Sequence, residues 1–261
     1  MLDNAITEGL QSGSMMASAL SLQLATEARA FARKLGLLRP LALLRIRILK
    51  RMGRGEYEQA FDDALHAVIR KDDVVWDVGA NLGLYTTKFA DWTGPQGQVV
   101  AFEPVPTCFA ELSQRVQDRP QVRALQRALG DTDQTTLMNM SDDPLAATHS
   151  FATHDQGTTS ISVQVSRGDS LVRELGLKVP NVIKVDVEGF EGEVLAGLGT
   201  MLDHPSCRAV LIEVHFGILD QRGKRQAPVE ICNRLRAAGF ELRWVDASHL
   251  VATRSEAKPG N

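Results

Sequence analysis

VVWDVGANLG, residues 74–83, joins a short β-branched run to a bend with two glycines, and a helical pattern follows over residues 84–91. A strand, a glycine turn and a helix in this order are typical of open parallel sheets, which bind ligands at the carboxyl ends of their strands. Gly79 lets the backbone turn off the strand, and Gly83 removes a Cβ from the path of a ligand. The free N–H groups at the start of the helix favour an anionic group. The segment therefore predicts a ligand site at the bend.

Short β-branched runs continue to alternate with helical patterns along the chain. Strands are predicted at residues 74–78, 98–102, 122–129, 181–187, 209–215, 240–245 and 249–253, and helices at residues 84–91, 106–119, 190–202 and 227–238. Such alternation indicates an α/β fold, in which helices cover both faces of a largely parallel sheet. The last two runs predict a terminal hairpin, whereas residues 131–168 are expected to form irregular strands and loops over one edge of the sheet.

Composition excludes several classes of protein. With 261 residues, of which 44% are hydrophobic and 23% charged, the chain can bury a full core, so it is neither disordered nor collagen-like. Cys108, Cys207 and Cys232 form no CxxC pair, so neither a disulfide framework nor a cysteine-built zinc site is expected. The sequence has no apolar run long enough to span a bilayer, and the acidic residues among the first thirty argue against a signal peptide. We expect a cytoplasmic protein.

Charge is distributed unevenly along the chain. Residues 29–54 hold nine basic residues and no acidic one, so removing them from the net charge of −3 leaves −12 for the rest. Leucines and isoleucines are interleaved with these cations, which predicts a helical, basic N-terminal cap over residues 1–70 and a larger α/β domain over residues 71–261. The cap either exposes its arginines to water or makes peripheral contact with the anionic inner surface of a membrane. Nucleic acid is not expected as a partner, because the acidic remainder would repel it.

An acidic residue follows the glycine bend at the spacing that a nucleoside ligand requires. Glu103 ends the next predicted strand, 20 residues beyond Gly83, where a carboxylate can accept both hydroxyls of a ribose. A dinucleotide usually demands the three glycines of GxGxxG, but only Gly79 and Gly83 are present. Asp77 would repel a pyrophosphate, whereas it suits the cationic amine of a methionine group. The bend therefore favours S-adenosylmethionine, with a nicotinamide-dependent oxidoreductase as the alternative.

The sequence resembles the FkbM-type family of S-adenosylmethionine-dependent methyltransferases from about residue 70 to residue 250. The motifs that carry the resemblance are VVWDVGANLGLYT (74–86), VVAFEPVP (99–106), ALGD (128–131), NVIKVDVEGFEGEVLAG (181–197) and LIEVHF (211–216). The resemblance implies a Rossmann-like seven-strand sheet with one antiparallel strand near the C-terminus. It also implies three groups of cofactor contacts: Asp77, Gly79, Asn81 and Gly83 with the methionine portion, Glu103 and Pro104 with the ribose, and Leu129, Gly130 and Asp131 with the adenine.

Charged side chains alternate along two neighbouring strands of the predicted sheet. Lys184, Asp186 and Glu188 follow one strand and its exit, and Glu213 and His215 follow the next core strand. With a period of two, each set projects to one side, and parallel neighbours bring both sets to the edge that holds the bend. Charges inside apolar runs are costly unless they are paired or used. We expect a catalytic cluster here, or else an ion pair of Lys184 with Asp186 or Glu213 that orders the strand ends.

The expected cluster would deprotonate and orient a hydroxyl for attack on the sulfonium methyl group. His215 is the preferred base because imidazole titrates near neutral pH, with Asp186 or Glu213 holding its tautomer. A carboxylate, Asp186 or Glu188, is the alternative base. A divalent ion on Asp186, Glu213 and His215 is a further option, although no metal is expected. His249 is expected near a turn, in a surface or capping role.

The resemblance implies O-methylation of hydroxyls on small molecules, including sugars and glycans. The cations of residues 217–225 follow His215 directly, so they either face an anionic or glycan acceptor or form a solvated loop. Phe190 is expected either to wall the cofactor pocket or to pack in the core. A non-catalytic module that docks to a membrane through residues 29–54 is the alternative from another class.

Overall fold

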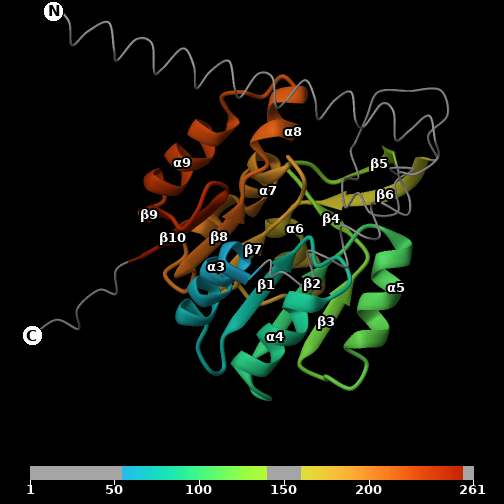
Figure 1. The fold of residues 1–261 in the computed structure, drawn as a ribbon. Coiled ribbons are helices and arrows are strands. Elements are labelled where there is room, and N and C mark those ends of the chain that lie inside the picture. Colours follow the sequence, from blue (N-terminus) through green and yellow to red (C-terminus); the bar gives the residue numbers. More distant parts are fainter. Residues whose placement is uncertain (1–54, 140–159, 255–261) are drawn as a thin grey trace, which may run out of the picture. The chain divides into compact units, whose positions relative to one another are not determined.

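The computed structural model describes residues 55–139 and 160–254, which build a seven-stranded sheet with helices on both faces (Figure 1). Its strands lie in the order β3-β2-β1-β7-β8-β10-β9, and β10 runs antiparallel to both of its neighbours. The other neighbouring strands are parallel. The strand bounds are β1 (Val74–Val78), β2 (Gln98–Phe102), β3 (Val122–Leu125), β7 (Val182–Val185), β8 (Ala209–Glu213), β9 (Glu241–Trp244) and β10 (His249–Thr253). The predicted fold is confirmed, including the single antiparallel strand and the terminal hairpin.

Alternate side chains of the central strands enter two separate cores, one on each face of the sheet. Trp76 packs on the face covered by α6, α7 and α9, whereas its neighbour Val75 packs on the face covered by α3 and α4. All five residues of β1 are buried, as expected of a strand covered on both sides. The helix bounds are α3 (Gly55–Val68), α4 (Leu84–Thr93), α5 (Pro106–Arg115), α6 (Gly168–Leu175), α7 (Glu191–Leu198), the 3₁₀ helix η1 (Gly199–Asp203), α8 (Phe216–Gln221) and α9 (Ala227–Ala237).

The strand predicted at residues 122–129 is in fact two strands in different sheets. After β3 ends at Leu125, the chain enters a small second sheet of order β4-β6-β5, made of β4 (Ala128–Leu129), β5 (Gln134–Asn139) and β6 (Ser160–Ser166). Arg127 ties the crossing in place, because its guanidinium donates to Ser166 Oγ at 2.9 Å. The strands expected in residues 131–168 are present as β5 and β6, and residues 140–159 lie outside the described residues.

Two predicted helices are shorter than their sequence patterns. α5 ends at Arg115 instead of Arg119, and Pro120 disfavours helical backbone in the residue before it. The helix predicted at residues 190–202 changes at Gly199, whose φ of 56° ends α7 and starts the 3₁₀ turn η1. The segment after His215, expected to be a loop, begins with helix α8.

The described part of the predicted N-terminal cap is α3. Its Phe61 and Leu65 are buried in the core that includes Val75 of β1. Residues 29–54 lie outside the described residues, so the domain boundary at residue 70 and the membrane contact stay predictions. Within residues 55–139 and 160–254, the helices fall short of the length and apolar character that crossing a bilayer requires.

Candidate active site

The glycine bend after β1 lies directly against the exit of β7. Gly79 has a φ of 77°, and a Cβ on it would lie 1.8 Å from the backbone oxygen of Asp186. Gly83 has a φ of 79°, and its Cβ would meet the side chain of Leu112 on α5 at 2.7 Å. Both glycines therefore permit close packing of the chain on itself. This differs from the expected role of Gly83, which was to clear the path of a ligand.

Asp77 and Lys184 form a buried tie between the bend and β7. Thr86 Oγ1 donates to Asp77 Oδ2 at 2.6 Å, and Lys184 Nζ lies 3.4 Å from Asp77 Oδ1 and 3.3 Å from Asp186 Oδ2. Lys184 also donates to the Gly79 carbonyl at 3.0 Å. Burial alone would lower the pKa of Lys184, but the two carboxylates raise it above its usual value, so the ammonium stays charged. The ion pair expected between Lys184 and Asp186 is present, and Lys184 has a structural part in the site.

Glu103, at the end of β2, keeps acceptor capacity for the hydroxyls of a ribose. Its Oε2 accepts the N–H of Asn81 and its Oε1 the N–H of Val105, both at 2.8 Å. Burial raises the pKa of Glu103, and those two hydrogen bonds partly offset the rise. A carboxylate has about four lone-pair sites, so a second acceptor position remains on each oxygen. Glu103 thus fits the role that the sequence predicts. Asp77 Oδ1 is buried without a hydrogen bond among the described residues, but Lys184 already lies 3.4 Å from it, so its contact with the methionine portion stays a prediction.

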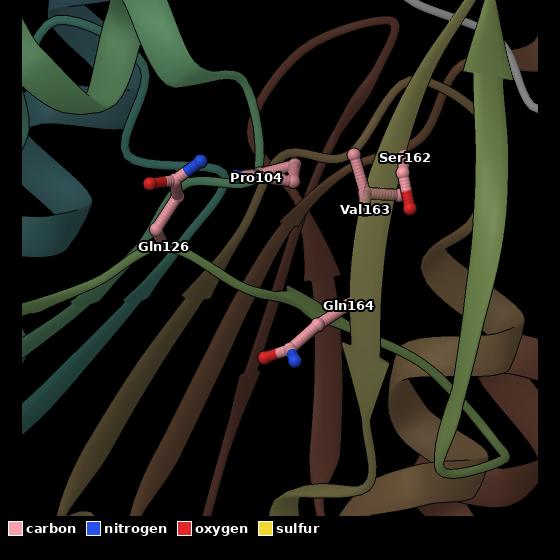
Figure 2. A pocket seen from close by; sticks show the side chains of 5 residues that line it. All are labelled: Pro104, Gln126, Ser162, Val163 and Gln164. Atoms are coloured by element: carbon pink, nitrogen blue, oxygen red, sulfur yellow. The ribbon is translucent and has the colours of Figure 1, made fainter.

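A hollow of about 330 Å³ lies beside this strand end (Figure 2). Pro104 and Gln126 line it from the ends of β2 and β3, and Ser162, Val163 and Gln164 line it from β6. Residues 129–131 are not among the residues that line this hollow, and their expected place at the border of the adenine stays a prediction. The N–H of Gly130 donates to the carbonyl of Ser166. The carbonyl oxygen of Gly130 lies so close to Gly197 of α7 that a Cβ on Gly197 would be 1.7 Å from it.

His215 lies at the end of β8 among three carboxylates. Its Nε2 is 3.2 Å from Glu188 Oε2 and 3.7 Å from Asp186 Oδ1, and its Nδ1 is 2.7 Å from Glu191 Oε1. Glu191 is fully buried and also accepts the N–H of Gly189 at 2.9 Å. The pairing of β7 with β8 brings Asp186, Glu188 and His215 together as the sequence predicts. Glu191 was not predicted; its only sequence signal is a charged residue at the start of an apolar helix.

The carboxylates shift the titration of the cluster. Burial opposes the charge of His215, but the hydrogen bond to Glu191 and the charges of Glu188, Glu191 and Asp186 raise its pKa to about 9. Burial and the neighbouring carboxylates raise the pKa of Glu188 to about 7, although His215 lowers it. Near neutral pH the imidazole is therefore charged, and Glu188 is the group that changes protonation.

Glu213 does not hold His215, contrary to expectation. Its Oε2 lies 3.5 Å from Nε2 of His249, whose Nδ1 is 2.7 Å from Asp246. The prediction that His249 lies at the surface is wrong, because it is 4% exposed and stacks on Phe61 at 4.1 Å between ring centroids. Its hydrogen bond to Glu213 lowers the pKa of that carboxyl. The register between β8 and β10 explains this contact, because it places Glu213 directly opposite His249.

The trio expected for a metal ion is not the one that the structure assembles. Asp186, Glu188 and His215 offer ligand atoms within 4.8 Å of one another, and Glu188 replaces Glu213 in this grouping. The raised pKa of His215 keeps a proton on the ring at neutral pH, and a metal ion would have to displace that proton.

The cations after His215 are engaged within the protein. Arg222 donates to the Gly189 carbonyl, pairs with Glu193 Oε1 at 2.9 Å and lies 3.5 Å from the centroid of the Phe190 ring. Lys224 also pairs with Glu193, and Arg225 pairs with Asp220. These contacts correspond to the alternative of a solvated, internally paired segment. Phe190 packs under Arg222.

Comparisons with known proteins point to one family. Residues 77–242 match the profile of the methyltransferase FkbM domain. The hexuronic acid methyltransferase AglP of Haloferax volcanii is 34% identical over 148 residues, which cover 57% of this chain and 58% of that protein. The 31-O-demethyl-FK506 methyltransferase FkbM of Streptomyces tacrolimicus is 32% identical over 219 residues, which cover 71% of this chain and 81% of that protein. The chain thus spans less than two thirds of AglP.

Solved structures resemble the fold at low identity. Fibrillarin of Aeropyrum pernix with bound S-adenosyl-L-methionine has a TM-score of 0.45 at 14% identity, covering 71% of this chain and 67% of that one. Precorrin-6y C5,15-methyltransferase of Geobacter metallireducens has a TM-score of 0.47 at 11% identity, covering 76% and 88%. Likeness at this level says nothing about the chemistry of the site.

Proposed function

This chain belongs to the FkbM methyltransferase family, whose methyl donor is S-adenosylmethionine, and from that premise we propose that it methylates a hydroxyl group of a sugar or another small molecule. The names of the two relatives support this acceptor class, since one methylates a hexuronic acid and the other 31-O-demethyl-FK506. The observation that carries the proposal is Glu188, a carboxylate with a pKa of about 7 at the same sheet edge as the glycine bend. Family membership excludes the oxidoreductase alternative.

Each residue of the cluster has a distinct part in this reaction. The cofactor, when bound, would supply a methyl group activated by its sulfonium. The hydroxyl oxygen would form a bond to this methyl group, and the bond from methyl carbon to sulfur would break. Glu188 accepts the hydroxyl proton and passes it to solvent. The charged His215 holds Glu188 in place and stabilises the negative charge that develops on the acceptor oxygen. Glu191 fixes the imidazole through Nδ1.

The choice of base differs from the first expectation. His215 was preferred from the sequence, with Asp186 or Glu188 as the alternative. A protonated imidazole cannot accept a proton, whereas a carboxylate that titrates near neutral pH is well matched to general base catalysis. The electrostatics therefore favour Glu188.

Substitution of the base tests the proposal. Glu188→Gln keeps the size of the side chain but cannot accept the proton, so methyl transfer to hydroxyl acceptors should fall by at least about a hundredfold. Calorimetry should show unchanged affinity for S-adenosylhomocysteine. Glu193→Gln, which removes a paired carboxylate from helix α7 just after the Glu188 turn, is the control and should keep the wild-type rate. Near wild-type turnover of Glu188→Gln would exclude Glu188 as the base, and transfer by the wild-type protein only to amines or carboxylates would exclude a hydroxyl acceptor.

The proposal for the location of the protein in the cell rests on the sequence alone. We propose a cytoplasmic protein with peripheral contact at the inner membrane surface through the basic residues 29–54. Flotation of the full chain with anionic vesicles, but not with neutral ones, is the expected result. Equal recovery with both would contradict it.

A further inference from the structure

Four exposed apolar side chains follow strand ends at the sheet edge that holds the candidate active site, and two of them form a contact. Leu82 and Leu84 follow the bend after β1, Phe216 follows β8, and Trp244 ends β9, which runs parallel to β8 because both pair antiparallel with β10. Large apolar groups are normally buried, and a cluster of them left in water marks a binding surface. The exposed large apolar residues of the described chain are Leu82, Leu84, Leu137, Phe216, Val229 and Trp244.

Two of these side chains, Phe216 and Trp244, touch each other. Their ring centroids are 5.7 Å apart at an interplanar angle of 37°, so the rings meet across the end of β10. Phe216 remains 44% exposed and Trp244 41% exposed. Phe216 is the residue after His215, so its backbone is one peptide unit from that of the charged imidazole. The pair therefore lies at the same sheet edge as His215, the group that we assign to the acceptor oxygen.

We propose that Phe216 and Trp244 form the platform that binds the acceptor, and that this acceptor is a pyranose ring. The inference rests on the proposed function and names its substrate class. A pyranose presents C–H groups on its face, which pack on aromatic rings, and hydroxyl groups around its rim. The rim hydroxyls can donate to the carboxylates of Asp186 and Glu188.

The acidic neighbours of the platform argue against a purely apolar acceptor. Asp186 and Glu188 are 30% and 23% exposed at their side chains, so a bound ligand would cover them. Covering a carboxylate without offering it a hydrogen-bond donor is costly. The aromatic pair favours a ligand with an apolar face, and the carboxylates favour a ligand with several hydroxyl donors. A pyranose has an apolar face and several hydroxyl donors.

Kinetics with a sugar panel test the platform. The full-length protein is assayed with methyl glucopyranoside, galactopyranoside, mannopyranoside and rhamnopyranoside, and with a linear alcohol. Trp244→Ala and Phe216→Ala should each raise KM for the methylated pyranoside about tenfold with little change in kcat, and Trp244→Phe should recover most of the loss. Affinity for S-adenosylhomocysteine should stay at the wild-type value. Val229→Ala, which trims another exposed apolar side chain, on α9, is the control and should leave KM unchanged.

A binding measurement separates this inference from the proposed function. Titration of the protein with the same pyranosides should change the tryptophan fluorescence of the wild type, and Trp244→Phe should abolish the change. A fluorescence response without methyl transfer would support the platform and contradict O-methylation. Methylation of the linear alcohol but of none of the pyranosides would overturn the platform while the proposed function stands. Unchanged KM in both alanine variants, or a shift in oligomeric state instead of in KM, would also overturn it.

Discussion

Glu191 shows how a fully buried residue can set the chemistry of a partly buried one. Its carboxylate is 2.7 Å from Nδ1 of His215, which leaves Nε2 directed at Glu188 and Asp186. The buried charge stabilises the imidazolium and fixes the orientation of the ring. Glu191 touches no acceptor in the proposed reaction, so it is a positioning residue.

Glu191→Gln should lower the pKa of His215 from about 9 toward the ordinary value of 6.5, because the amide keeps an acceptor oxygen but carries no charge. The titration of the His215 ring, followed by NMR, measures the shift directly. Glu193→Gln on the same helix should leave that titration unchanged. A His215 pKa that stays near 9 in Glu191→Gln would show that the other carboxylates suffice.

The rate of methyl transfer should depend on pH in a bell shape. Activity rises as Glu188 loses its proton around pH 7, and it falls as His215 loses its charge around pH 9. Initial rates at saturating cofactor across pH 5.5–10, a range chosen to bracket the two pKa values, measure the profile. In His215→Asn the alkaline limb should disappear. A rate that continues to rise through pH 9 would instead identify neutral His215 as the base.

At the scale of elements, the sequence predicted what depends on local pattern. β1 and β2 match their predicted bounds because continuous apolar runs buried on both faces leave little choice. The end of β7 likewise places Lys184 and Asp186 against the bend, and the turn that follows brings Glu188 to His215. The features that the sequence did not predict depend on residues far apart in the chain. The second sheet forms only when β4 pairs with β6. Glu213 contacts His249 because β8 and β10 pair these two residues. Glu191 is absent from the prediction because it begins helix α7, beyond the strand pattern, and reaches His215 only through the packing of that helix.

The junction of β1 and β7 should tolerate no side chain at Gly79. Alanine there would adopt an unfavourable positive φ and would place its Cβ 1.8 Å from the Asp186 carbonyl. Gly176→Ala is the matched control, since Gly176 lies in the left-handed region with a φ of 63° and has nothing within 4 Å of an added Cβ. We expect the control to lower the free energy of unfolding by about 1–2 kcal/mol and Gly79→Ala to lower it by more. Urea unfolding measures both, and equal losses would mean that the bend moves freely away from β7.

At the scale of the whole molecule, the raised pKa values couple folding to pH. His215 binds its proton more tightly in the folded protein, so its contribution to stability is complete below pH 6.5 and is lost as the pH rises through about 9. His249, whose pKa is also raised, acts in the same direction. Glu188 does so at lower pH, between its ordinary value of 4.5 and about 7. The fold is therefore expected to weaken with alkalinity.

The free energy of unfolding should fall by roughly 2 kcal/mol between pH 6.5 and 9.5, once the partial exposure of the His215 ring is allowed for. Urea denaturation at several pH values provides the measurement. His215→Asn should flatten the dependence, whereas Val229→Ala should not. A stability that increases over this interval would contradict the assigned direction of the shift.

The aromatic pair occupies α8 and β9, whereas the proposed donor contacts come from the ends of β1 and β2. These two groups of elements lie on opposite sides of the β7–β8 pair that carries the charged cluster. On the proposed platform, protein engineers would vary the exposed residues Phe216 and Trp244 to admit new acceptors, and would keep the buried strand β10 and the ends of β1 and β2 unchanged. Most variants in a library at these two positions should still bind the methyl donor. They should differ mainly in the acceptor that they methylate.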